Sequence, residues 1–292
     1  MRFSVVVPTH NRRDLLERVV AAILDQTLPR EHYELIVVDD GSRDGSEALG
    51  EALAGRLGFK FIRQDNRGPA AARNRGIAEA TGEVVAFTDD DCLVPRDWLE
   101  RLADGYRRHS QVAGVGGGLR APEEVLARSA VARLEAFIAR EVYGVGGEER
   151  LGGFECPAGG TNNMSYRREV LLEVGGFDES FGPDVSGEEA DLKLRITQRG
   201  GLLLYVPVWV EHLRDYSLGC HLRQSFQRGR GEAHFRLKHE GRRGWLRALV
   251  RLAAAPAKLL AAPLGTDPGR RAAAAAGQLA HALGVLSYRP GR

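Results

Sequence analysis

Short apolar runs alternate with amphipathic stretches along the first 90 residues. The runs predict buried strands at residues 3–8, 35–38, 59–63 and 83–88. The stretches between them predict helices from residue 11, over 46–57 and over 68–80, with Asn11 as the N-cap of the first helix. This β-α-β-α-β-α-β order favours a parallel α/β sheet with helices on both faces, and strands that are apolar throughout fit burial on both sides.

Further elements are predicted towards the C-terminus. We expect helices at residues 96–109, 122–141, 167–174 and 187–198, a strand at 112–118 and a closing strand pair at 202–210. The glycine-rich residues 144–160 predict a mobile loop, and no internal repeat is visible.

An amphipathic pattern covers residues 245–260. Its apolar side carries Trp245, Leu249, Leu252, Pro256 and Leu259, and its basic side carries Arg243, Arg247, Arg251 and Lys258. The segment has too many charges to span a bilayer, and residues 272–288 are dominated by alanine and interrupted by Gln278 and His281. Two interpretations stay open: the segment lies in the interface of an anionic membrane, or it packs on the preceding domain with its basic face in water.

The charge is unevenly distributed along the chain. Residues 1–212 carry 26 Lys and Arg against 35 Asp and Glu, whereas residues 213–292 carry 15 against 4. We therefore expect a domain at 1–212 and a basic helical C-terminal extension at 213–292. The basic extension indicates an anionic surface as a partner, and the acidic first part argues against a nucleic acid.

The three cysteines, Cys92, Cys156 and Cys220, are far apart and form no C-x-x-C pair. This pattern argues against a disulfide framework or a zinc site and favours a reducing compartment. The N-terminus enters a predicted strand at once, with no signal peptide visible, so we expect a cytoplasmic protein.

Three aspartates, Asp89, Asp90 and Asp91, follow Thr88 at the end of the fourth predicted strand. Ligands bind at the carboxyl ends of strands in open α/β sheets, and adjacent acids repel unless a cation or solvent offsets their charge. A divalent metal that holds a diphosphate is the natural use of such a cluster. A solvated acidic turn is the alternative.

Loops after the other strands carry further polar residues. They contain Thr9 and Asn11, the Asp39-Asp40-Gly41-Ser42 run, and Asn66-Arg67-Gly68 followed by Arg73. A doubly wound sheet brings these loops to one rim, where such side chains could bind a base, a ribose and phosphate. Taken singly, each has a structural alternative: a helix cap, a turn or a surface charge.

Six motifs occur in a known order: Val5 to Arg12, Val37 to Ser42, Ala72 to Ile77, Thr88 to Asp91 with Pro95, Gly175 to Glu179, and Gly187 to Leu192. In these motifs residues 1–212 resemble the family-two glycosyltransferases of GT-A fold. The resemblance implies a GT-A, Rossmann-like, mostly parallel sheet and inverting sugar transfer from a nucleoside-diphosphate donor, by default a UDP-sugar. It does not cover residues 213–292.

The resemblance also implies roles for single residues. The nucleotide would contact Pro8, Thr9, Asn11, Asp39, Asp40, Arg73, Asp89 and Asp90. Asp91 would bind Mn²⁺ or Mg²⁺, with Asp89 facing the ribose or the metal, and with His212, which would favour Mn²⁺. Gly160, Thr161 and Asn162 would border the acceptor and the donor sugar. A structural role is the alternative for His212, and a tight turn for residues 159–163.

A base must remove the proton of the acceptor hydroxyl, and a carboxylate on a rigid helix meets that need. Glu188 and Glu189 at the start of a predicted helix are the candidates. The family usually has Glu-Asp here, so Glu189 departs from the pattern, and Asp191 is the substitute. The alternatives are an acidic first turn that favours the helix dipole, and an ion pair between Asp191 and Arg195.

We therefore expect a metal-assisted glycosyltransferase at the cytoplasmic face of a membrane, acting on a glycan or lipid-linked acceptor in cell-surface polysaccharide or glycolipid synthesis. A sugar-nucleotide pyrophosphorylase is less favoured, because residues 8–13 lack the glycine-rich, lysine-bearing loop of that reaction. A non-catalytic nucleotide-sugar-binding or membrane-scaffold protein is the third hypothesis. Trp98 and Trp209 lie in apolar contexts and are expected in the core.

Overall fold

The computed structural model describes residues 1–261 and 267–288, of which residues 242 and 245–261 are described by their backbone alone. The described chain divides into two compact units. Unit 1 comprises Met1–Arg120, Tyr143–Glu179 and Glu188–Leu213. Unit 2 comprises Ala121–Val142, Ser180–Gly187 and Arg214–Arg292. The division at residues 212 and 213 that the charge pattern suggests stays a prediction.

Unit 1 begins with the predicted alternation of strands and helices. Its first elements are β1 (Phe3–Thr9), α1 (Arg13–Leu24), the short η1 (Arg30–His32), β2 (Tyr33–Asp40), α2 (Ser46–Leu57), β3 (Lys60–Gln64), α3 (Pro69–Glu79) and β4 (Val84–Phe87). The four strands are parallel and lie in the order β3-β2-β1-β4. Their carboxyl ends therefore meet at one edge of the sheet.

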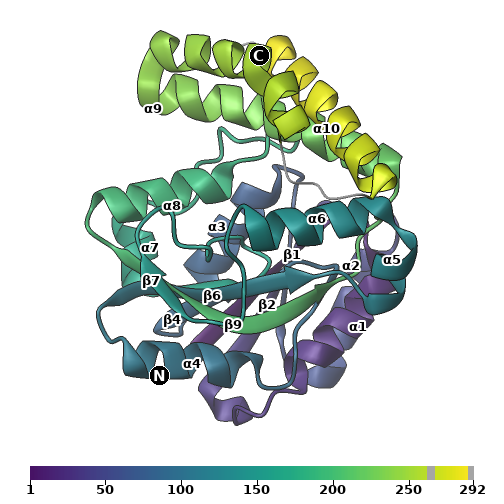
Figure 1. Cartoon of the computed structure of the whole chain (residues 1–292). Helices are drawn as coiled ribbons and strands as arrows, with labels where there is room; N and C mark the ends of the chain where they lie inside the picture. Colours follow the sequence, from purple (N-terminus) through teal and green to yellow (C-terminus); the bar gives the residue numbers. More distant parts are fainter. Residues whose placement is uncertain (262–266, 289–292) are drawn as a thin grey trace. The chain divides into compact units, whose positions relative to one another are not determined.

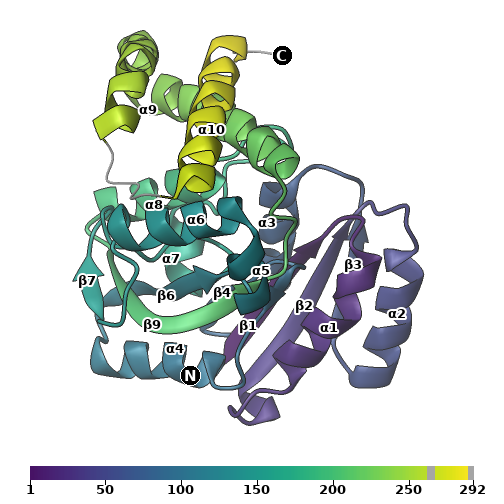
Figure 2. The same ribbon diagram turned by 45° about the vertical axis from the view of Figure 1, so that its right-hand side comes forward.

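Helices cover both faces of this sheet, which confirms the predicted α/β fold class. Val5 and Val7 point to a face covered by α1, α2 and α4 (Trp98–Arg108), and Trp98 is fully buried there as expected. Figure 2 shows α1 and α2 in front of the first strands. On the other face, α3 comes so close that a Cβ at Gly76 would lie 2.3 Å from Val6.

The second half of the sheet is mixed. It contains β5 (Cys92–Leu93), β6 (Val112–Arg120), β7 (Arg150–Gly152), β8 (Met164–Arg167) and β9 (Leu202–His212), and the helices α7 (Arg168–Glu173) and α8 (Glu188–Gln198) belong to the same unit. From β4 the order continues β8-β6-β9-β5, with β7 paired to β9.

Two sequence-based predictions about this half were wrong. Residues 202–210 belong to one strand, β9, because they pair in parallel with β6 throughout, although the register shifts at two irregularities. The predicted loop at 144–160 contains β7, which gains its hydrogen bonds from β9, a partner distant in sequence.

Unit 2 is helical. Its helices are α5 (Glu123–Arg128), α6 (Ala130–Glu141), α9 (Leu218–Ala261) and α10 (Pro268–Ser287). The Ser129 and Asp267 side chains cap the starts of α6 and α10. Figure 1 shows α10 running beside α9, and added Cβ atoms at Gly229 and Gly284 would lie 2.0 Å from carbonyl oxygens of the neighbouring helix. Glycine at these positions lets the two helix backbones touch.

The predicted amphipathic segment at 245–260 is helical in its backbone, as part of α9 beyond the kink at Gly241. The side chains on which its two faces depend lie outside the described residues. Within the described part of the chain, no helix is long and apolar enough to cross a membrane.

Candidate functional site

Asp91 is the most enclosed of the three aspartates that follow β4. Its Oδ1 lies 3.2 Å from His212 Nε2, and its Oδ2 lies 3.5 Å from Arg12. The antiparallel pairing of β5 with β9 sets Cys92 opposite His212, which brings these distant residues together. Burial disfavours the charged form of Asp91, but His212 and Arg12 outweigh it and lower the pKa of this carboxyl.

The residues around Asp91 fit a divalent cation. Ligand atoms of Asp91, Cys92 and His212 all lie within 4.8 Å of one another. Neighbouring ligands of an octahedral cation with bonds of about 2.1 Å lie about 3.0 Å apart, close to the separation of Asp91 Oδ1 and His212 Nε2. Burial raises the pKa of the Cys92 thiol well above its usual value, so the hard carboxylate and the imidazole are the suitable donors.

Asp90 lies between two other acids. Its Oδ2 accepts a hydrogen bond of 3.2 Å from the backbone N–H of His10. Burial and the neighbouring Asp91 charge raise its pKa to about 7, against the opposing effect of Thr9 and Arg12. The surroundings of Asp90 thus disfavour its charged form, whereas those of Asp91 favour it.

Asp39 and Asp40, at the end of β2, are both buried, and each already accepts hydrogen bonds from the chain. Asp39 accepts from the Ser42 N–H and from Arg63, the latter at 3.1 Å. Asp40 accepts from the Gln64 side chain at 2.8 Å and from the backbone N–H groups of Arg67 and Gly68 at 3.0 and 2.8 Å. These carboxylates shape the loops after β2 and β3.

The loop after β1 is held against the loop after β2. Pro8 and Thr9 pair with Val38 and Asp39 in the parallel register, and Thr9 is buried. Asn11 has a positive φ of 54°. Its backbone N–H donates to Ser42 Oγ, and its side-chain oxygen accepts from the Arg43 N–H in the loop after β2. The prediction that Asn11 caps the first helix is wrong, since Arg12 takes the N-cap position.

Arg73 on α3 joins two parts of the site. Its side chain is 4 % exposed. Its two terminal nitrogens donate to Asp89 Oδ1 at 2.9 Å and to Glu188 Oε1 at 2.8 Å, and the guanidinium lies 5.7 Å from the Phe177 ring centroid. The two carboxylates outweigh its burial, so its pKa is raised and it stays charged. Arg73 therefore ties the end of β4 to the start of α8.

The candidate bases differ in what they contact. The Glu188 carboxylate is bound to Arg73, whereas Glu189 accepts hydrogen bonds from Thr161, at 3.1 Å for the backbone N–H. Burial and the Glu188 charge raise the pKa of Glu189, while Arg73 and Thr161 oppose the rise. Asp191 is fully buried and forms the expected ion pair with Arg195 at 2.7 Å.

The segment before β8 lies beside the aspartate cluster. The Asn162 carbonyl accepts from Thr88 Oγ1 at 3.1 Å, and Thr161 and Gly160 precede it. Asn163 is buried and bonded to the Trp98 indole at 2.8 Å, which anchors this turn to the core. Residues 160–162 thus lie between Thr88 and Glu189.

Three residues at the site, Arg12, His10 and Cys92, were not predicted individually from the sequence. Arg12 pairs with Asp91, the His10 N–H bonds Asp90, and Cys92 joins the donor cluster. His10 and Arg12 lie within the motif Val5 to Arg12, so the sequence placed them near the site without giving them a role. Nothing in the spacing indicated the pairing of Cys92 with His212.

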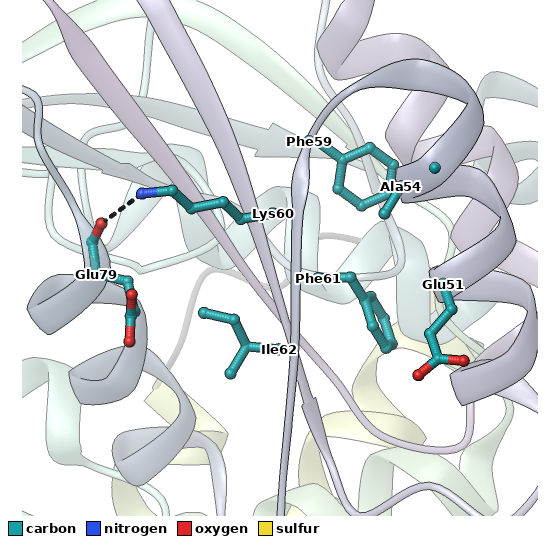
Figure 3. A pocket seen from close by; sticks show the side chains of 8 residues that line it. Glu51, Ala54, Phe59, Lys60, Phe61, Ile62 and Glu79 are labelled. Carbon is teal, nitrogen blue, oxygen red and sulfur yellow. Dashed lines mark hydrogen bonds between the residues drawn. The ribbon is translucent and has the colours of Figure 1, made fainter.

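A separate, shallow surface pocket of about 540 Å³ lies along the edge strand β3, between α2 and α3 (Figure 3). Its lining residues are Glu51, Ala54, Gly55, Phe59, Lys60, Phe61, Ile62 and Glu79. At this pocket the Lys60 ammonium donates a hydrogen bond of 2.9 Å to the backbone carbonyl of Glu79. None of the predicted site residues lines this pocket, so it is distinct from the carboxylate cluster.

Known proteins resemble this chain in sequence and in fold. Residues 4–175 match the family model described as glycosyl transferase family 2. The chain is 32% identical over 213 residues to the glucosyl-dolichyl phosphate glucuronosyltransferase of Haloferax volcanii, a match that covers 69% of this chain and 65% of that protein. The chain thus spans just under two thirds of that relative's length.

Solved structures share the fold. The mannosyltransferase PcManGT from Pyrobaculum calidifontis, in complex with GDP-Man and Mn²⁺, aligns with a TM-score of 0.65 at 23% identity, over 96% of this chain and 86% of that one. TarS 1-349 from S. aureus, in complex with UDP-GlcNAc, aligns with a TM-score of 0.55 at 17% identity, over 100% and 93%. At these identities the likeness establishes the fold, the GT-A fold expected from the motifs.

Proposed function

The chain belongs to glycosyl transferase family 2, and on that premise we propose that it transfers a sugar from a nucleoside-diphosphate donor to an acceptor hydroxyl, with inversion and with a divalent metal. Family membership favours this function over a pyrophosphorylase or a binding scaffold. One observation carries the proposal: Arg73 bridges Asp89, beside the candidate metal ligands, to Glu188, beside the candidate base.

In this proposal Asp91 and His212 hold Mn²⁺ or Mg²⁺, and Asp89 lies next to the donor ribose or the metal. The metal would act as a Lewis acid that stabilises the charge of the departing diphosphate. Arg73 pairs with Asp89 at 2.9 Å, and Arg12 adds positive charge beside Asp91. Mn²⁺ in the PcManGT complex supports a metal-assisted reaction, while the choice of metal stays a prediction.

The donor base and ribose would rest on the loops after β1, β2 and β3. Asp39 and Asp40 act by shaping those loops, since their oxygens already accept bonds from the chain. Pro8, Thr9 and Asn11 line the first loop, and Asp90 and Arg73 would meet the ribose and phosphate side. UDP stays the default nucleotide; the solved relatives carry GDP-Man in one case and UDP-GlcNAc in another.

We assign the general base to Glu189. Burial and the Glu188 charge raise its pKa, which makes it a stronger proton acceptor than an ordinary glutamate, whereas Glu188 is paired with Arg73 and Asp191 with Arg195. Glu189 would take the acceptor hydroxyl proton as the oxygen bonds to the anomeric carbon and the bond from that carbon to the diphosphate oxygen breaks. Gly160, Thr161 and Asn162 would border the acceptor and donor sugar, and one displacement inverts the anomeric centre.

The acceptor is proposed to be a glycan or a lipid-linked sugar of the cell surface. The Haloferax relative is named for a glucosyl-dolichyl phosphate, and residues 213–292 carry the basic excess that an anionic membrane would attract. Peripheral attachment to the cytoplasmic face of a membrane stays a prediction.

The experiment is a donor-hydrolysis and transfer screen of the full chain with GDP- and UDP-sugars, with Mn²⁺, with Mg²⁺ and after chelation. We expect release of nucleoside diphosphate that requires metal and is lost in Asp91→Asn. Metal-independent turnover would contradict the metal assignment. Pyrophosphate release from sugar phosphate and nucleoside triphosphate would overturn the transfer reaction, as would a lack of turnover with every donor.

A further inference from the structure

The motif Ala72 to Ile77 on α3 contains an asparagine, Asn74, whose side chain binds the backbone of a distant motif. Asn74 Nδ2 donates to the Phe177 carbonyl at 2.9 Å, and the Phe177 N–H donates to Asn74 Oδ1 at 2.8 Å. Nδ2 also donates to Glu179 Oε1 at 3.0 Å. A carboxamide carries both donors and an acceptor, so one side chain satisfies both backbone groups of Phe177.

The turn before Phe177 is built for close approach to Asn74. Gly175 and Gly176 have φ values of +78° and +68°, which favour glycine. A Cβ added at Gly176 would lie 2.5 Å from Asn74 Oδ1, so a larger residue would displace the amide. Arg195 of α8 donates to the Gly176 carbonyl at 2.7 Å and gives the turn a second support. The turn should therefore persist when the Asn74 side chain is removed.

Phe177 in turn supports Arg73. Its side chain is 2 % exposed, and its ring meets the Phe87 ring edge to face, with centroids 5.4 Å apart. The Arg73 guanidinium lies 5.7 Å from the Phe177 ring centroid, and an aromatic face attracts a cation. The terminal nitrogens of Arg73 bind Asp89 and Glu188, while its Nε has no hydrogen-bond partner among the described residues. The ring is thus a further contact that fixes the guanidinium.

We infer that Asn74 is a positioning residue for the transfer reaction: by holding Phe177 it fixes the ring against which Arg73 lies, and so the bridge from Asp89 to Glu188. This role rests on the proposed function. All five residues belong to unit 1. A shift of Arg73 would loosen both sides of the candidate site, and a misplacement of about 1 Å can lower a rate about 10²-fold.

The same displacement would change the ionisation of the candidate base. Burial raises the pKa of Glu189, as do the charges of Glu188 and Asp89, whereas Arg73 and Thr161 lower it. If Arg73 leaves its place between the carboxylates, its lowering effect weakens and the pKa of Glu189 rises further. The acid limb of kcat/KM, which follows the ionisation of Glu189, would then move to higher pH. A general loss of stability would leave that limb in place.

The test compares Asn74→Ala with wild type in the full chain. We expect kcat to fall at least about tenfold and the acid limb to move to higher pH. Gln26→Ala is the matched control: the Gln26 amide also bonds a distant carbonyl and N–H, those of Pro95 at 3.0 Å and Leu99 at 3.1 Å. Gln26 lies between α1 and β2, at the opposite edge of the parallel strands. Its loss should lower the thermal midpoint and leave kcat and the acid limb unchanged.

Phe177→Leu is a second variant that keeps the backbone bonds to Asn74 and removes only the aromatic ring. We expect kcat to fall about twofold to fivefold, the equivalent of one cation–π contact, with a smaller shift of the acid limb in the same direction. Asn74→Ala with a lowered thermal midpoint but wild-type kcat and acid limb would show a structural role alone and overturn the inference. So would wild-type kcat and acid limb in Phe177→Leu, which decides the matter if Asn74→Ala does not fold.

The two levels of proposal can fail separately. If wild type transfers sugar and both variants behave like Gln26→Ala, only the positioning role fails. If wild type shows no turnover with any donor, the proposed function fails and the positioning role with it.

Discussion

Consecutive aspartates lie at the end of β2 and just after the end of β4 in unit 1, and their surroundings differ. After β2, Asp39 and Asp40 accept hydrogen bonds from Ser42, Arg63, Gln64, Arg67 and Gly68. After β4, Asp90 and Asp91 crowd each other, and the pKa of Asp90 rises to about 7. The first pair is held by hydrogen bonds that shape a loop, whereas the second cluster contains a carboxyl, Asp90, whose charged form its surroundings disfavour.

The strongest test of this comparison is Asp91→Asn. Loss of one metal ligand should lower sugar transfer by about 10³-fold or more, since a bound metal supplies several kcal/mol of transition-state stabilisation. The thermal midpoint without ligand should fall only slightly, because relief of the repulsion with Asp90 offsets part of the lost contacts with His212 and Arg12. A large fall in that midpoint would show that Asp91 is structural, like Asp40.

Glu189→Gln tests the other side of the site. Because its pKa is raised, Glu189 stays protonated to a higher pH than an ordinary glutamate, and only the deprotonated form can accept a proton. The wild-type kcat/KM should therefore rise with pH through this raised pKa and then level off. In Glu189→Gln that acid limb should vanish and the rate should fall about 10²- to 10³-fold.

Glu188→Gln is the control for this profile. It weakens the contact with Arg73 and leaves the Glu189 carboxylate in place, so the acid limb should persist at a lower rate. The limb should move to lower pH, because the Glu188 charge helps to raise the pKa of Glu189. An acid limb that survives in Glu189→Gln would assign the base to another group.

Asp40→Asn makes the same chemical change as Asp91→Asn, but at a carboxylate that accepts hydrogen bonds from Gln64, Arg67 and Gly68. The introduced amide NH₂ faces donors instead of accepting from them, so we expect a loss of about 2 kcal/mol in the free energy of unfolding, with or without metal. Urea unfolding of the two variants side by side measures the difference. Equal stabilities would break the distinction between the two loops.

The smallest effect on stability is expected at Glu34, a carboxylate away from the site that accepts several hydrogen bonds. Burial opposes its charge, but bonds from Thr81, Ser4 and Lys60 outweigh burial and lower its pKa to about 2. Its contribution is present above the unfolded pKa of about 4.3 and is lost as the pH falls through about 2. The stability advantage of wild type over Glu34→Gln should therefore shrink between pH 5 and 2.

Much of unit 1 could be predicted because its elements are local. The helix at 46–57 matches α2 residue for residue, and each of the first four strands begins within two residues of the expected position. Consecutive valines and isoleucines suffice to indicate a strand buried on both faces. β5 and β7 could not be predicted, because two or three residues become a strand only when β9 is beside them.

The site could be predicted as a set of residues and not as a set of contacts. Asp91 and His212 were both candidates, and the ion pair of Asp191 with Arg195 followed from helical spacing. The sequence held no signal that Arg73 bridges Asp89 and Glu188, since these residues come from three separate elements.

By itself the sequence determined the order of strands and helices, the family, and the acids that follow β2 and β4, since these depend on local patterning and motif order. Tertiary structure alone decided which acids are neutralised by the chain and which are left crowded. That outcome depends on donors brought in from distant elements, such as Arg63 and Gly68 for one loop and His212 for the other. Burial then sets how strongly each unpaired charge is felt.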